Sequence, residues 1–318
     1  MRSDVVAWLC QGDPSIVYQV HRDLFDEDES VCAALKKEIS DRGWGKTLLT
    51  LQKPDGHWGE GYYRPKWTST HYTLLLLRNL GIEPQRSLLD ICRRVLDEEK
   101  GRDGGMSPTA QRIYSDCCIT GMFLNISAYF GVESDQLKSL IDYLIDMQLP
   151  DGGYNCRHPR SPVHHGSFHT TICVLEGLWE YTCQGYEYRL DEVTSARRRA
   201  EEFLLIHRLF LSDKDDRIID PRFLSMHYPS HWHYDVLRSL EYFVFSKHDA
   251  DPRLNEALMW VQGKCQDQKY PLSPMYSGQV HLTLEKSGKF SRLNTLRVYR
   301  IFKYFHIGAE DDESVQIE

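Results

Sequence analysis

The sequence lacks long apolar runs. Its longest purely aliphatic stretch, Leu74 to Leu77, is far shorter than the ~20 residues that a helix needs to cross a bilayer. The apolar run from Val5 to Cys10 is too short for the core of a signal peptide, and no small-residue cleavage site follows it. We therefore expect a cytoplasmic protein without a membrane span.

The sequence also has fewer basic residues than acidic ones. The chain has 38 Lys and Arg residues against 46 Asp and Glu residues, so its formal net charge is −8 at pH 7. This balance argues against a general nucleic-acid binder. The 9 cysteines are odd in number and scattered, which is typical of reduced thiols rather than of a disulfide framework. Phosphate-binding glycine loops, dinucleotide fingerprints and nucleophile elbows are missing, which disfavours those enzyme classes.

What the sequence does contain is an internal repeat. The segments LLTLQKPDGHWG and LIDMQLPDGGYNC each hold a glutamine, a glycine and an aromatic residue at the same spacing: Gln52, Gly56, Trp58 and Gln148, Gly152, Tyr154. A weaker copy contains Gly104, so that successive glycines are 48 residues apart. A fixed period of this length indicates a helical-repeat architecture.

Segments that are apolar nearly all round follow the glycine turns and predict buried helices at 70–81, 116–131, 169–181, 233–245 and 294–305. Amphipathic segments alternate with them at 85–99, 134–147, 191–208 and 252–265. The first helices are expected at 14–25, 30–41 and 44–52. The pattern predicts an all-α fold, an (α/α) toroid of about five to six helical hairpin repeats. It forms one domain, residues 1–307, followed by a disordered acidic tail at 308–318.

The turn sequence Gln-Lys-Pro-Asp-Gly-His-Trp at 52–58 resembles the QW motif of squalene and oxidosqualene cyclases. The whole pattern resembles the prenyltransferase and squalene-oxidase repeat superfamily over most of residues 40–306, and is sharp only at 48–81 and 144–181. The resemblance implies a toroid with a central cavity for a hydrophobic, isoprenoid substrate.

The cyclase branch protonates its substrate with an Asp-x-Asp-Asp motif, and Asp213-Lys214-Asp215-Asp216 matches that string. A carboxylic acid that donates this proton must lie at the cavity wall, shielded from water. Here Lys214 and Arg217 would keep the carboxylates ionised in a run of charges. We therefore predict a solvated hairpin loop rather than a cyclase acid.

Protein prenyltransferase β subunits form a second branch, and hold one zinc ion with an Asp-x-Cys pair and a histidine of the next repeat. The resemblance implies that Asp116, Cys118 and His169 are zinc ligands with one open position, a set suited to catalysis. Alternatively, Asp116 caps a helix, Cys118 is a small core residue and His169 is a buried histidine. Helix geometry alone leaves Cys117 and Cys118 equally eligible as the ligand. The family's diphosphate-binding residues are replaced, with Arg112 as a partial substitute.

The starts of the other buried segments carry His71 and His233, and either of these candidate catalytic residues could act as acid, base or fourth ligand. The position of His71 is equivalent to that of His169 if the two are two repeats apart. Aromatic and basic residues nearby are candidates for substrate binding, although packing would explain the aromatics equally well: Trp67, Tyr72, Arg112, Tyr114, Phe168, Trp232 and Tyr234. The sequence thus predicts a zinc-dependent enzyme acting on a hydrophobic, isoprenoid substrate. The alternative is a non-catalytic toroid that binds a lipid or isoprenoid without metal.

Overall fold

The computed structural model describes residues 3–108 and 114–307. Helices make up more than half of these residues, and the strands in the described ranges form one short pair, β1 (Tyr270–Pro271) with β2 (Phe290–Ser291). The predicted all-α class is therefore confirmed. Arg112 and the acidic tail at 308–318 lie outside the described residues.

The five segments predicted as buried helices are all helical. They are α5 (Thr70–Leu80), α7 (Cys117–Tyr129), α9 (Phe168–Cys183), α11 (Val236–Phe245) and α13 (Arg292–Tyr304). Gly81 ends α5 with a φ of 84°, the left-handed conformation that glycine adopts without strain. The helix α11 begins three residues later than predicted, because the carboxylate of Asp235 caps it by accepting a hydrogen bond from the backbone N–H of Arg238.

The amphipathic segments form a second set of helices: α6 (Arg86–Glu99), α8 (Ser134–Asp146), α10 (Leu190–Ile206), and α12 (Asn255–Gln262) after the 3-10 turn η3 (Pro252–Leu254). The N-terminal region forms α2 (Pro14–Asp23), α3 (Glu29–Asp41) and α4 (Gly43–Thr50) as predicted. It also forms α1 (Ser3–Cys10), which was not predicted. Two further 3-10 turns are η1 (Lys66–Thr68) and η2 (Pro221–Phe223).

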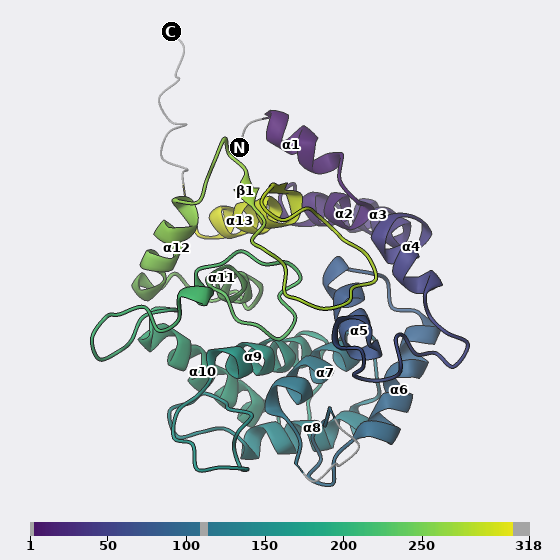
Figure 1. Ribbon diagram of the computed structural model, residues 1–318, viewed down its shortest axis with the longest axis vertical. Helices are drawn as coiled ribbons and strands as arrows, with labels where there is room; N and C mark the ends of the chain where they lie inside the picture. The colour runs from purple at the N-terminus through teal and green to yellow at the C-terminus, as the bar shows by residue number, and fades with distance from the viewer. Residues whose placement is uncertain (1–2, 109–113, 308–318) are drawn as a thin grey trace.

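The helices α5, α7 and α9 pack side by side, with α6 and α8 against α7, and α10 against α9. On the other side of the molecule α11 packs on α13, and α13 packs on α2 (Figure 1). The long connection between β1 and β2, residues 272–289, crosses the face of the molecule that is turned to the viewer. Within the described ranges, no helix is both long and apolar enough to cross a bilayer.

The predicted glycine turns recur with the same local geometry. Gly56, Gly104 and Gly152 have φ values of 83°, 88° and 85°, in the region where a side chain would be strained. In two of the copies the glutamine closes the turn, because the Nε2 atoms of Gln52 and Gln148 donate hydrogen bonds of 2.9 and 2.7 Å to the carbonyl oxygens of Gly56 and Gly152. The sequence repeat is therefore a repeat of structure at these turns.

A threonine hydroxyl holds each of these turns to the following buried helix. The backbone N–H groups of Trp58, Met106 and Tyr154 donate to Thr70, Thr120 and Thr171, and that of Tyr270 donates to Thr295, over 2.9 to 3.0 Å. These threonines set the register between the repeats. The predicted equivalence of His71 and His169 is consequently wrong, because Thr70 matches Thr171 and His71 falls three residues further along its helix. Cys118 and His169, in contrast, are each two residues before their threonine.

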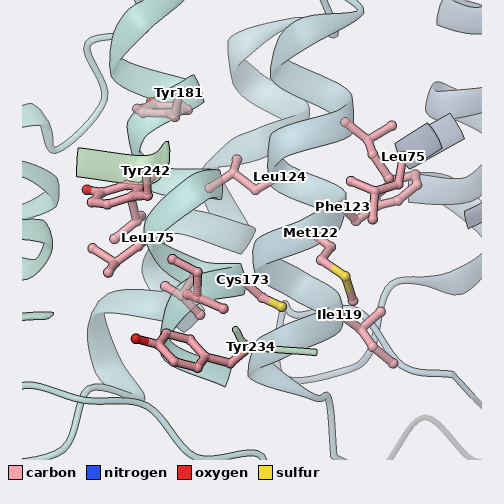
Figure 2. Packing of buried hydrophobic residues seen from close by; sticks show 14 of the residues in the cluster. Leu75, Ile119, Met122, Phe123, Leu124, Cys173, Leu175, Tyr181, Tyr234 and Tyr242 are labelled. Atoms are coloured by element: carbon pink, nitrogen blue, oxygen red, sulfur yellow. The ribbon is translucent and has the colours of Figure 1, made fainter. Parts of the chain in front are cut away.

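The tightest helix packing joins α7 and α9. Gly121 and Gly177 face each other so closely that a methyl group added at Gly177 would overlap the carbonyl oxygen of Gly121. Figure 2 shows the buried side chains around this contact, including Leu124 of α7 and Leu175 of α9. Because glycine has no side chain, the two backbones approach closely, and α7 and α9 pack tightly against each other.

Candidate functional site

The predicted histidines lie near the N-terminal ends of the buried helices. His71, in the first turn of α5, is fully buried, and its Nδ1 atom lies 3.1 Å from the hydroxyl oxygen of Tyr62. Its Nε2 atom has no hydrogen-bond partner among the described residues. Burial lowers the pKa of His71 to about 3, so the ring is neutral at pH 7.

His233 is held in a stack of rings, 3.9 Å from Trp232 and 3.5 Å from Tyr276 between ring centroids. Its neighbour His231, which was not among the predicted site residues, stacks on Trp67 at 4.1 Å. Burial lowers the pKa of both histidines to about 3. At pH 7 they are therefore neutral aromatic surfaces, and neither carries the charge of an imidazolium.

Trp67 and Tyr72 line a cavity of about 140 Å³, which we call the aromatic pocket. Other parts of its wall come from the segment 272–289, including Tyr276 and Leu282. This segment is fixed to Trp67, whose Nε1–H donates a hydrogen bond of 2.8 Å to the carbonyl oxygen of Ser277. A side chain at residue 278, a glycine, would overlap the Trp67 indole. Two of the predicted substrate-binding residues thus face a real cavity.

The remaining predicted substrate-binding residues do not line a described cavity. Phe168 and Tyr234 pack edge to face at 5.1 Å in the hydrophobic core, and the Tyr234 hydroxyl donates to the carbonyl oxygen of Leu209 over 2.6 Å. Tyr114 is 49% exposed. Trp232 packs on His233, and its indole nitrogen has no hydrogen-bond partner in the described ranges. For Phe168 and Tyr234, packing accounts for the aromatic side chain.

The predicted zinc ligands lie at the same end of α7 and α9 but are engaged with other groups. The carboxylate of Asp116 forms an ion pair with Arg160 at 2.5 Å, while burial raises its pKa against the opposing effect of that arginine. The Nδ1 atom of His169 accepts a hydrogen bond of 2.8 Å from the backbone N–H of Tyr234. Burial, together with nearby arginines, lowers the pKa of His169 to about 4.

A second thiol lies beside Cys118. The Sγ atom of Cys156 is 3.3 Å from the backbone N–H of Cys118 and 3.4 Å from the hydroxyl oxygen of Thr170. Cys156 was not among the predicted site residues, because the spacing of its loop matches no motif. The thiols of Cys118 and Cys156 therefore lie beside each other at the N-terminal end of α7.

These side chains do not fit a zinc ion in the positions described. Within residues 3–108 and 114–307, no three His, Cys, Asp or Glu side chains form a group that could hold a metal. Asp116 would have to leave Arg160 before it could act as a ligand. We derive no reaction step through a metal, and the zinc site stays a prediction based on resemblance.

A second cavity, of about 350 Å³, lies toward the C-terminal ends of α5, α7 and α9. It adjoins the aromatic pocket, since Tyr228 and His231 line both. We call it the charged cavity, because its wall contains six cations and four carboxylates: Arg22, Lys36, Arg78, Arg238, Arg297 and Arg300, with Asp23, Glu176, Glu180 and Glu241. Arg238, Arg297 and Arg300 lie within helices that were predicted to be buried, and these charges were the only feature of the sequence that indicated the cavity.

The Asp-x-Asp-Asp string lies in an exposed hairpin, as predicted. A hydrogen bond from Arg217 lowers the pKa of Asp215 to about 2, so this carboxylate is ionised. Asp216 forms an ion pair with Arg208. The string lies on the wall of neither cavity and cannot protonate a ligand there.

No protein-family model matches the chain, and no curated protein is significantly similar to it in sequence. The function must therefore be argued from the cavities and the side chains around them.

Proposed function

We propose that the protein binds a hydrophobic, isoprenoid-like small molecule in the aromatic pocket, at the centre of an (α/α) toroid whose inner layer comprises α2, α5, α7, α9, α11 and α13. The repeated turns and threonine contacts support the toroid. The cavity wall supports the ligand class, because Trp67, Tyr72, Tyr276 and Leu282 present aromatic and aliphatic surface. The single observation that carries the proposal is this pocket beneath the segment 272–289.

The pocket's volume limits what it can hold. About 140 Å³ is below the ~300 Å³ of typical drug-sized sites, so the pocket takes part of an apolar chain rather than a whole polycyclic product. Polar groups at its edge provide orientation, since the Thr73 hydroxyl oxygen lies 3.1 Å from Nε2 of His281. This arrangement supports selective binding of a linear chain.

A zinc-dependent reaction on the same ligand is the second candidate. The observation that favours it is that Cys118 and His169 occupy equivalent positions in consecutive repeats, with the thiol of Cys156 beside the first. The alternative is a non-catalytic binding protein, which requires the aromatic pocket alone. Both candidate functions require a ligand in the aromatic pocket, so one binding experiment tests this shared requirement.

Calorimetric titration with farnesol tests the proposal. We expect saturable binding to the wild-type protein and weaker binding to Leu76→Phe, because the added ring volume enters the pocket wall. Leu190→Phe, at an exposed position on α10, is the matched control and should bind as the wild type does. The proposal fails if farnesol does not bind, or if the two variants bind it equally well.

A further inference from the structure

We infer a second binding site: the charged cavity binds a small oxyanion, a phosphate group or a dicarboxylate. The inference does not depend on the hydrophobic ligand, because other side chains carry it. The two residues shared by the cavities, Tyr228 and His231, are aromatic and add no charge at pH 7.

The cavity wall has an excess of positive charge. Six cations face four carboxylates, which leaves two positive charges unbalanced. Asp235 lies behind the wall, where its carboxylate accepts hydrogen bonds from the backbone N–H of Arg238 and the hydroxyl of Ser230, at 2.8 and 3.4 Å. Its charge acts on Arg238 and Arg297 and offsets part of this excess. Unbalanced charge in a poorly hydrated cavity is unfavourable unless a counter-ion supplies the missing negative charge.

Three guanidinium groups share two carboxylates on one side of the cavity. Glu241 pairs with Arg297 at 2.8 Å and also with Arg300. Asp23 pairs with Arg300 at 2.6 Å and with Arg22 at 2.5 Å. Burial alone would raise the pKa of Asp23, but Arg300 and Arg22 hold it below its ordinary value, so the carboxylate is ionised. Since Arg297 and Arg300 are only 4% and 5% exposed, water screens them poorly.

The opposite side of the cavity offers donors that are not fully used. Arg78 pairs with Glu180, but its Nε atom is buried without a hydrogen-bond partner in the described ranges. Lys36 reaches the cavity from α3 with its ammonium 5.6 Å from the ring centre of Tyr129, and no ion pair to it is found among the described residues. Burial, and then the charge of Arg22, lower the pKa of Lys36, and the charges of Glu83 and Glu180 oppose this effect only in part.

The shape of these donors specifies the ligand class. Guanidinium groups bind carboxylate and phosphate oxygens through paired N–H donors, and an ammonium group adds a point charge. A bound oxyanion would neutralise the positive charge that remains on the wall. A volume of about 350 Å³ admits a small molecule of this kind, such as a phosphate ester or a four-carbon dicarboxylate.

Calorimetry of the full chain with inorganic phosphate and, separately, with succinate tests the inference. We expect at least one of these dianions to bind saturably, and the tighter one identifies the source of the charge. Lys36→Met should weaken that binding roughly tenfold, because it removes one cation from the wall while leaving every carboxylate paired. Lys37→Met, on the exposed side of the same helix, is the matched control and should bind as tightly as the wild type.

Thermal unfolding confirms that both variants are folded before their affinities are compared. The inference is overturned if neither dianion binds the wild-type protein, or if Lys36→Met and Lys37→Met bind it equally well. The farnesol experiment tests Leu76→Phe in the aromatic pocket, so either proposal can fail without contradicting the other. Retention of dianion binding by Leu76→Phe is the expected sign that the two sites are separate.

Discussion

The backbone N–H of Tyr154 donates a hydrogen bond of 3.0 Å to the hydroxyl oxygen of Thr171, and both residues are fully buried. The bond spans a glycine turn and the start of the next buried helix. The same contact recurs at α5, α7, α9 and α13, and it fixes where these four buried helices begin. The threonines, more than the glycines, therefore determine which side chains project at the N-terminal ends of these helices.

Replacing Thr171 with valine should destabilise the protein by about 1–3 kcal/mol, because the variant keeps the side-chain shape but leaves the buried N–H of Tyr154 without an acceptor. Urea unfolding followed by circular dichroism measures the change. Thr182→Val on the same helix is the control, since that hydroxyl bonds only to the carbonyl oxygen of Trp179. Equal stability of the two variants would show that the turn contact is not required.

The close contact between α7 and α9 leads to a second prediction. Gly177→Ala should lower the free energy of unfolding by about 1–3 kcal/mol, because the methyl group overlaps the carbonyl of Gly121 and forces the helices apart. Gly263→Ala, where an added methyl group would lie at least 3.5 Å from its neighbours, should be nearly neutral. A stable Gly177→Ala variant would contradict the packing described for this helix pair.

The alternation of apolar and amphipathic segments was sufficient to predict the helices from α5 to α13, but α1 was not predicted. The five buried helices begin within three residues of their predicted starts, since each pattern extends over several turns. The pattern failed where structure depends on distant contacts. The segment 272–289 is held by Trp67 and Ser277, which are 210 residues apart, and neither has a local signal for that pairing.

The charged residues within the buried helices explain why the charged cavity was not predicted. Arg238 and Arg297 stand among apolar residues of α11 and α13, and their partners Glu176 and Glu241 come from other helices. A pattern along one helix shows that such a residue is present but not that a partner faces it. The aromatic pocket was anticipated only through Trp67 and Tyr72, because the rest of its wall comes from the unpredicted segment.

The exposed hairpin at 212–217 should tolerate loss of a carboxylate. Asp215→Asn is expected to leave both the free energy of unfolding and ligand binding unchanged within error, because the Asp215 ion pair with Arg217 is solvated. Chemical denaturation and the farnesol titration provide the two readouts. A folded variant that no longer binds farnesol would mean that this string contributes to the site after all.

Metal analysis tests the zinc prediction. The resemblance implies one zinc ion per chain, and Cys118→Ala should remove it. Arg160→Gln should increase zinc affinity, because it releases the Asp116 carboxylate from its ion pair. Arg157→Gln, at an exposed position three residues away, is the matched control. If the wild-type protein neither carries zinc nor takes it up in dialysis, the zinc prediction is wrong.

The buried neutral histidines make the fold sensitive to acid. His71 has a pKa of about 3 in the folded protein, whereas an unfolded chain binds a proton near pH 6.5. Its contribution to stability is therefore fully present above pH 6.5 and is lost as the pH falls toward 3, because only the unfolded state gains the proton. Between pH 7 and pH 4.5 the loss from this one residue is on the order of 2–3 kcal/mol.

His71→Gln should accordingly reduce the dependence of stability on pH over that interval, whatever its effect at pH 7. Urea unfolding at pH 7 and pH 4.5 measures the slope for each protein. His164→Gln, which replaces an exposed histidine, should keep the slope of the wild type. If His71→Gln loses as much stability as the wild type on acidification, the imidazole of His71 must already take up its proton in the folded state, and its burial beside Tyr62 would not keep it neutral.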